Sequence, residues 1–476
     1  SKVLLNIYTF CRPLPDLNVV GPMPENLYLL ECLFGSMVKD RKEIEDKFAT
    51  YNKMGVKYWI YEYWGCYTHG AWSVIDTIDW ELKLMKKTNA IGIRVENGTG
   101  FACVGLDNYI GARLIWNPDL NADALIDDYC EKGFGAAKTY MKEYFALLNR
   151  LSANMSQNAS GFAAMIYLMP DFYTADCFTQ AAALFDKALK CKISPEERAR
   201  VQFFHTGFRY TAINTEWSRT LQNALAAGAD LPLLRPAKQP ERYTDEWLRE
   251  TLKNAFNAAE NRRSMQEAQM NLGTIDTSNR LERLIDKMPY YILLQQNLYA
   301  LNKGRFNYAI NGAFEYRSYD ENAPLYGWKS EGGKHSIDLE YCHDSIHNVT
   351  AMYHGNQGRS YKLELADGEK SILAAAVPLQ VSAGSKWTVS GYFRNPQNVD
   401  VKAQFVFFCD GEETIVEAQL AAKGLLEDSG WQEWTFTPAI APQGENVSCR
   451  VRLAFANMGK ASVVLNADDI KLMKAK

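Results

Sequence analysis

Four short, almost uninterrupted apolar runs near the start of the chain constrain its fold more than any other feature. They are VLLNIYTF (3–10), LYLLECLF (27–34), VKYWIYEYW (56–64) and IGIRVEN (91–97). Such runs are typical of strands buried on both faces of a parallel sheet. Amphipathic segments at 39–55 and 75–90 separate the last three runs and have the length of crossover helices. The sequence therefore predicts a β, βαβαβ order.

The pattern of the sequence changes twice after these strands. From Asn117 to about Asn302, apolar residues at three- and four-residue spacing predict almost nothing but helix. After Lys303, polar and apolar residues alternate between Gly and Asn turns, which is typical of an antiparallel β-sandwich. We therefore expect a multidomain α/β + α + β chain, divided into residues 1–116, 117–303 and 304–476.

Composition and charge exclude several classes of protein. The chain of 476 residues is 47% hydrophobic and has a formal net charge of −4 without any sustained run of Lys or Arg, so we expect no nucleic-acid partner. No apolar segment approaches the roughly 18–20 residues of a membrane span, and the first residues do not resemble a signal peptide. Ten cysteines without a CxxC pair indicate neither a zinc site nor a disulfide framework.

Aromatic residues make up an unusual 12% of the chain: 26 Tyr, 22 Phe and 11 Trp. Aromatic faces fill hydrophobic cores and also stack on the apolar faces of sugar rings. The excess is compatible with a protein that handles carbohydrate.

Three of the predicted strands carry a carboxylate towards their carboxyl end: Glu31, Glu62 and Glu96. In a parallel sheet closed as a barrel, functional side chains gather at these ends. Two carboxylates within reach of one glycosidic bond can serve as acid and as base or nucleophile. The alternative is a structural carboxylate paired with a cation such as Arg94. We favour that alternative for Glu31, because it lies earlier in its strand.

Other motifs that suggest chemistry do not hold. In ENGTGFACVG (96–105) Cys103 replaces the third glycine of a dinucleotide-binding loop. His343, His347 and His354 lie in a β-rich region, where an i,i+4 pair does not share a face as it does on a helix. The chain has no HExxH, GxSxG or P-loop motif, so the usual metalloprotease, hydrolase-elbow and NTPase interpretations are excluded.

A family resemblance begins at VKYWIYEYW and IGIRVENG and is most specific in ARLIWNPDLNADALIDDYCEKGFGAA (112–137). These segments resemble the α-glucuronidase-like family of bacterial barrel proteins. That family is similar in its barrel to β-N-acetylhexosaminidases and includes endo-β-N-acetylglucosaminidases that act on N-glycans. Over residues 1–300 the resemblance implies the second half of a (β/α)₈ barrel followed by the family's helical region.

The resemblance also implies a missing part. A barrel needs eight strands, and four precede the helical segment here. In the related hexosaminidases the catalytic acid is carried by the other half. We therefore expect an N-terminal half-barrel elsewhere in the same gene product or in another chain, or else a remodelled, non-catalytic fold.

A second resemblance concerns the last part of the chain. FNYAINGAFEYRSYDENAPLYGWKS (306–330) and LNADDIKLM (465–473) resemble jelly-roll carbohydrate-binding modules attached to polysaccharide hydrolases. In those modules the matching motifs help to form a structural calcium site. Glu315 and Asp468 are the ligands implied for Ca²⁺, with a pair of solvated acids as the alternative. Trp328 is a candidate sugar platform, with a core position as the alternative.

Together these observations predict a glycoside hydrolase, or the C-terminal part of one, acting on amino-sugar or uronic-acid glycans without a catalytic cofactor. The alternative is a non-catalytic glycan-binding protein. An exported bacterial protein, periplasmic, cell-surface or secreted, is expected, with its signal outside this sequence. The predicted catalytic pair is Glu62 and Glu96. The predicted substrate-binding residues are Tyr8, Tyr61, Tyr63, Trp64, Asn97 and Trp328.

Overall fold

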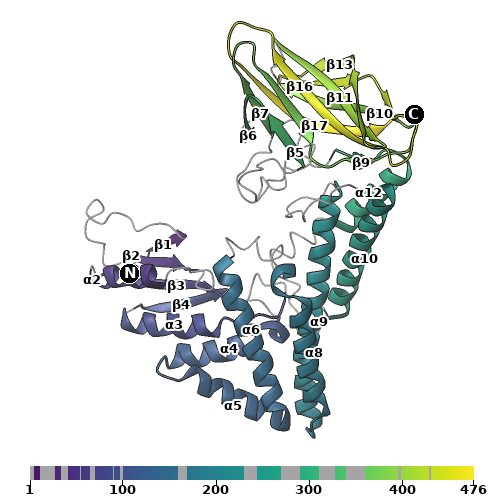
Figure 1. Ribbon diagram of the computed structural model, residues 1–476. Helices are drawn as coiled ribbons and strands as arrows, with labels where there is room; N and C mark the ends of the chain where they lie inside the picture. Colours follow the sequence, from purple (N-terminus) through teal and green to yellow (C-terminus); the bar gives the residue numbers. More distant parts are fainter. Residues whose placement is uncertain are drawn as a thin grey trace. The chain divides into compact units, whose positions relative to one another are not determined.

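The computed structural model describes the chain in segments, and the chain divides into two compact units (Figure 1). The first unit comprises Ser1–Arg219 and Glu260–Met288, and the second comprises Thr220–Ala259 and Pro289–Lys476. The described residues are 5–10, 27–33, 41–53, 55–64, 70–88, 90–96, 100–158, 169–229, 244–269, 290–309, 327–338, 360–394, 398–427 and 430–475.

A four-stranded parallel sheet opens the first unit. Its strands pair in the order in which they occur in the chain: β1 (Leu5–Phe10), β2 (Leu27–Cys32), β3 (Tyr58–Tyr63) and β4 (Gly92–Glu96). Helix α2 (Arg41–Lys53) connects β2 to β3, and α3 (Ile75–Lys87) connects β3 to β4. The predicted parallel sheet with crossover helices is confirmed, and its sequential order is that of neighbouring strands in a (β/α)₈ barrel.

The crossover helices pack on one face of this sheet. Phe48 and Tyr51 of α2 lie with their ring centroids 4.7 and 5.4 Å from that of Tyr58 on β3. The Tyr58 hydroxyl also bonds to Thr88, which caps the carboxyl end of α3. Since successive strand residues point to opposite faces, Ile60 and Glu62 share the helix-facing side with Tyr58.

Among the described residues, five further long helices follow in the first unit, and the last of them continues into the second. They are α4 (Phe101–Trp116), α5 (Ala122–Phe134), α6 (Lys138–Asn158), α8 (Ala175–Lys190) and α9 (Pro195–Ala226), with a short 3₁₀ turn, η2 (Gly135–Ala137), after α5. A capping box precedes α9: the Ser194 hydroxyl accepts from the Glu197 N–H, and the Glu197 carboxylate accepts from the Ser194 N–H. Gly135 ends α5 at a φ of 51°, a backbone conformation that favours glycine.

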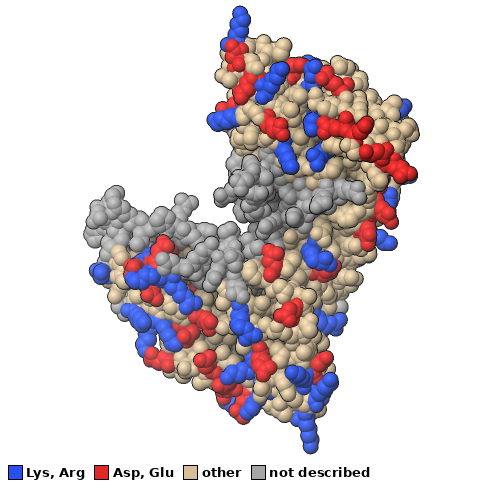
Figure 2. Space-filling view, viewed as in Figure 1, with Lys and Arg blue, Asp and Glu red and all other residues tan. Residues whose placement is uncertain are grey.

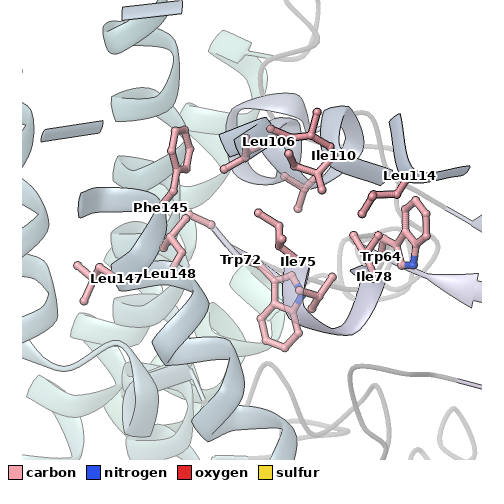
Figure 3. Close-up of a cluster of buried hydrophobic side chains, with 14 of the residues drawn as sticks. Trp64, Trp72, Ile75, Ile78, Leu106, Ile110, Leu114, Phe145, Leu147 and Leu148 are labelled. Carbon is pink, nitrogen blue, oxygen red and sulfur yellow. The ribbon is translucent and has the colours of Figure 1, made fainter. Parts of the chain in front are cut away.

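A continuous hydrophobic core joins the sheet to these helices (Figure 3). Figure 3 shows Trp64 beside Leu114 of α4 and Ile78 of α3. Helix α4 approaches closely because position 111 is glycine: a Cβ there would lie 2.2 Å from Cζ3 of Trp64. The strand end, α3 and α4 therefore pack as one block.

A buried carboxylate holds the beginning of α3. Asp107 of α4 is 2% exposed and accepts a hydrogen bond from the backbone N–H of Val74, the residue before α3. Burial raises the pKa of Asp107 to about 7, against the opposing effect of that N–H.

The second unit contains the β-sandwich and the helices that lead into it, the first part of α10 (Asp245–Gln269) and α12 (Tyr290–Asn302). One sheet has the order β13-β14-β10-β17-β7-β6, with β15 paired to β10, and the other has the order β12-β11-β16-β8-β5, with β9 paired to β16. The strands are β5 (Trp328–Glu331), β6 (Lys334–Asp338), β7 (Ser360–Leu365), β8 (Lys370–Ala375), β9 (Leu379–Gln380), β10 (Lys386–Arg394), β11 (Val399–Cys409), β12 (Glu412–Ala418), β13 (Leu420–Leu426), β14 (Trp431–Phe436), β15 (Ala439–Ile440), β16 (Ser448–Asn457) and β17 (Val463–Lys474).

All pairings in these two sheets are antiparallel. Burial alternates along the strands, most regularly in β16, where every second residue is buried. The multidomain α/β + α + β layout predicted from the sequence is confirmed. In the described part of the chain, no helix is long and apolar enough to cross a membrane.

Candidate functional site

The strand register divides the predicted site residues between the two faces of the parallel sheet. Tyr61 pairs with Arg94 and Tyr63 with Glu96, so these four residues lie on the face opposite the crossover helices. Glu62 pairs with Val95 on the helix-facing side. The two carboxylates that the sequence predicts as a catalytic pair thus lie on opposite faces, and the structure does not bring them together.

Glu62 has a different neighbour, the carboxylate of Glu81 on α3. The side chains of Glu62 and Glu81 are 1% and 0% exposed. Burial, and the charge of Glu62 beside it, hold the pKa of Glu81 well above its usual value, although Arg41 acts in the opposite direction. The indole N–H of Trp64 also lowers this pKa, but the proton that Glu81 keeps can be donated to Glu62. The two residues form a buried acid pair inside the sheet–helix layer.

Glu31 is a structural carboxylate, as the sequence favours. It is 1% exposed on the helix-facing side of β2, forms an ion pair with Lys47 of α2, and accepts a hydrogen bond of 3.1 Å from the Tyr51 hydroxyl. The cation comes from α2 and not from β4. A buried ion pair that is also hydrogen-bonded offsets the cost of removing the charge from water.

Glu96 lies on the opposite face, at the carboxyl end of β4. It accepts a hydrogen bond of 2.6 Å from the hydroxyl of Tyr61, which orients its carboxylate. The guanidinium of Arg94 lies 5.3 Å from the centre of the Tyr61 ring. We call Tyr61, Arg94 and Glu96 the strand-face cluster. It combines a half-buried carboxylate, a phenol and a cation in adjacent positions.

Neighbouring aromatic and thiol groups surround this cluster. Tyr63 makes an edge contact with Tyr61 at 5.0 Å between ring centroids, and its hydroxyl lies 3.9 Å from Sγ of Cys32. Tyr8 pairs with Leu30 in the strand register. Asn97 lies outside the described residues.

The two tryptophans among the predicted substrate-binding residues are buried in the core. Trp64 is 4% exposed and packs into the core against Gly111. Trp328 is 2% exposed and pairs with Ala375 between β5 and β8. Both occupy core positions, the alternative that the sequence left open for Trp328, and neither ring presents an open face to a ligand.

The predicted calcium ligands are placed only in part. Asp468 is 2% exposed on β17 and accepts a hydrogen bond of 2.8 Å from the N–H of Asp469. Glu315 lies outside the described residues. Within the residues that the structure describes, no three His, Cys, Asp or Glu side chains gather in a way that could hold a metal ion. Asp468 alone does not make such a site.

Glu81 is the residue that the sequence analysis missed, although a signal was present. The buried apolar positions Ile78, Leu82 and Met85 define one face of α3, and Glu81 lies three residues after Ile78 and four before Met85. A carboxylate on the apolar face of a helix has to find a partner or remain protonated. Helical spacing therefore identifies a buried acid, and only the structure identifies Glu62 as its neighbour.

Comparison with known proteins gives one family match and several structural similarities. Residues 17–146 match a family model described as a domain of unknown function, DUF4838. No match is found among curated proteins.

Among solved structures, a family GH115 4-O-methyl-α-glucuronidase with specificity for decorated arabinogalactans is similar over 97% of this chain and 56% of its own, with 11% identity and a TM-score of 0.34. A CBM61 module in complex with β-1,4-galactotriose is similar over 36% of this chain and 99% of its own, with 18% identity and a TM-score of 0.23. The CBM22-1 xylan-binding domain from Paenibacillus barcinonensis is similar over 35% of this chain and 92% of its own, with 15% identity and a TM-score of 0.21.

Proposed function

We propose that the chain is part of a glycoside hydrolase for amino-sugar or uronic-acid glycans and that the strand-face cluster belongs to its substrate site. The observation that carries this proposal is the hydrogen bond from Tyr61 to Glu96 on the face opposite the crossover helices. In a (β/α)₈ barrel the helices lie outside and catalytic groups sit at the carboxyl ends of the strands. Glu96 fits this position, whereas Glu62 lies on the helix side.

The chemistry available to the cluster follows from its groups. Glu96 can accept a hydrogen bond from a sugar hydroxyl, or act as the base or nucleophile of a two-carboxylate mechanism. Tyr61 fixes the carboxylate, and the exposed Arg94 beside it favours an anionic or strongly polar group nearby. Tyr63 adds an aromatic face on the same side of β3.

The second carboxylate of the mechanism has to come from another part of the protein. Of the three strand carboxylates Glu31, Glu62 and Glu96, Glu96 is the one on this face in the described part of the sheet. We propose that the partner acid is supplied by a further set of barrel strands, in the same gene product or in another chain.

Turnover by the complete protein tests the proposal. Glu96→Gln should reduce glycan cleavage by at least about 100-fold, because a neutral amide cannot act as base or nucleophile, and Tyr61→Phe should reduce it by about 10-fold through loss of orientation. Glu62→Gln is the control, with an unchanged kcat. The substrates are N-glycans, glucuronoxylan fragments and chitooligosaccharides, with products separated by chromatography. Unchanged turnover in Glu96→Gln would reject the proposal.

The position of Glu62 favours a second candidate, a glycan-binding protein without turnover. Glu62, one carboxylate of the predicted pair, lies on the helix side of the sheet. The opposite face, which carries Glu96, can therefore bind a sugar and still lack the acid that cleavage needs. Calorimetric titration followed by chromatography of the same mixtures separates the two functions. Binding that weakens in Glu96→Gln without any cleavage by the complete protein would establish the binding function.

A further inference from the structure

The first unit contains a groove of about 640 Å³ between α4, α5 and α9, lined by helix residues and not by the strand-face cluster. Its volume lies within the range of about 300–1,000 Å³ that is usual for small-ligand sites. Its lining includes Phe101 and Tyr109 of α4, Lys132 and Gly133 of α5, and Arg200 and Phe204 of α9.

Aromatic rings form most of this groove. Phe134 and Phe204 are 1% and 5% exposed, with ring centroids 5.9 Å apart, and Tyr129 lies 5.9 Å from Phe134. Tyr109 lies 5.0 Å from Tyr129, and Phe101 is 49% exposed. Phe134 and Phe204 are thus the buried floor of the groove, and the ring surface open to the apolar face of a ligand lies on Phe101 and the half-buried Tyr109 and Tyr129.

The charged groups of the groove carry a net positive charge. Asp128 forms an ion pair with Lys132, with 2.5 Å between Oδ1 and Nζ, and this lysine holds the pKa of Asp128 below its usual value. Nη1 of Arg200 on α9 donates to the carbonyl oxygen of Gly133 at 3.1 Å, which holds the guanidinium against α5. One carboxylate and two cations leave one positive charge without a counterpart among the lining residues.

We propose that this groove binds an acidic sugar residue, a uronic acid of a glycan chain. The sugar ring stacks on the aromatic surface, and its carboxylate lies beside Arg200 and Lys132, where a planar guanidinium suits a carboxylate. Asp128, which is paired with Lys132, positions that cation at the groove. The inference rests on the proposed function and deepens it, because it selects the acidic glycans and adds a binding site apart from the strands.

Gly133 gives a direct way to test the groove. A Cβ at this position would meet nothing within 4 Å, so a large side chain there can fill the groove. Gly133→Phe should weaken binding at least tenfold, whereas Gly133→Ala, the matched control, should leave it unchanged. Arg200→Met removes the charge but keeps the length of the side chain, and should also weaken binding at least tenfold.

The titration uses the full chain and two probes, xylotriose carrying one 4-O-methylglucuronic acid and unsubstituted xylotriose. We expect the acidic probe to bind more tightly, and its affinity to fall with added salt. Equal affinity for the two probes would overturn the inference. So would an acidic probe that binds all three variants as tightly as it binds the natural chain. Thermal melting of Gly133→Phe checks that this variant folds. If Gly133→Phe unfolds, the affinity of Arg200→Met for the acidic probe decides whether the groove binds it.

Glu96→Gln, titrated in parallel, separates this inference from the proposed function. Loss of turnover in Glu96→Gln with unaltered binding in the groove variants would refute the groove and leave the hydrolase intact. Groove-dependent binding of the acidic probe without cleavage by the complete protein would support the groove and refute the hydrolase.

Discussion

At the residue scale, the alternation of a strand decides which carboxylates can work together. Glu62 and Glu96 look equivalent in the sequence, because each lies near the carboxyl end of a predicted strand. In the β3–β4 register Glu62 and Glu96 are offset by one position. This offset places Glu96 beside Tyr61 and Glu62 beside Glu81. In the aromatic strand β3, Glu62 is therefore one member of a buried acid pair.

This acid pair predicts a measurable dependence of stability on pH. Because the pKa of Glu81 is raised in the folded protein, the folded state keeps that proton to higher pH than the unfolded chain does, and stability falls as pH rises above about 4.3. Glu81→Gln mimics the protonated acid, so it should flatten this fall and stabilise the protein by about 1–3 kcal/mol at pH 8.

Urea unfolding from pH 4.5 to pH 8 measures the effect. Glu143→Gln, at an exposed position of α6, is the control and should reproduce the natural slope. Asp107 adds its own loss of stability between about pH 4 and pH 7 in every variant, so the difference between variants isolates Glu81. A steeper fall in Glu81→Gln than in the natural chain would contradict the assignment.

At the element scale, the sequence predicts which segments form strands and helices better than it predicts how they meet. Apolar runs and helical spacing identify β1 to β4, α2 and α3, because these signals are local. The partner of Glu31 is Lys47, from the helix after its strand, where the sequence offered Arg94. Such contacts depend on side-chain packing between elements, which a single sequence does not record.

Two helical glycines allow the packing of α4 to be tested. A methyl group at Gly111 would lie 2.2 Å from Cζ3 of the buried Trp64, so Gly111→Ala should destabilise the protein by about 1–3 kcal/mol despite the better helix propensity of alanine. At Gly133 the methyl group meets nothing within 4 Å, so Gly133→Ala should be neutral or stabilise by up to about 1 kcal/mol. Both are measured by thermal and urea unfolding. Equal effects of the two substitutions would show that packing against Trp64 does not limit this position.

At the scale of the whole molecule, the sequence predicts the distribution of charge but not the order of the strands in the sandwich. Lys and Arg are interspersed with Asp and Glu over the face in Figure 2, in agreement with the absence of any long basic run in the sequence. Period-two patterning predicted the sandwich. The order of its strands was beyond the sequence, because β17 pairs with both β7 and β10, which are far from it in the chain.

The side chain of Asn307, in the segment after α12, forms hydrogen bonds to β17, the last strand of the sandwich. Asn307 donates from Nδ2 to the Ile470 carbonyl at 3.1 Å and accepts from the Leu472 N–H at 2.9 Å, while the Tyr308 N–H donates to the Leu472 carbonyl at 2.8 Å. These bonds connect residues more than 160 positions apart, 163 for Asn307 and Ile470. They hold the edge of β17 that β7 no longer covers beyond Ala467, while pairing with β10 on the other edge continues to Lys474.

Asn307→Ala should therefore loosen the end of β17. Its loss leaves the Leu472 N–H and the Ile470 carbonyl without their partner, at a cost of about 1–3 kcal/mol. Hydrogen exchange should quicken at Leu472 and Tyr308. Asn302→Ala, which removes an exposed bond from Arg249, is the control and should change stability by less than about 0.5 kcal/mol. If exchange at Leu472 stayed slow in Asn307→Ala, the neighbouring Tyr308 bond would suffice to hold the strand.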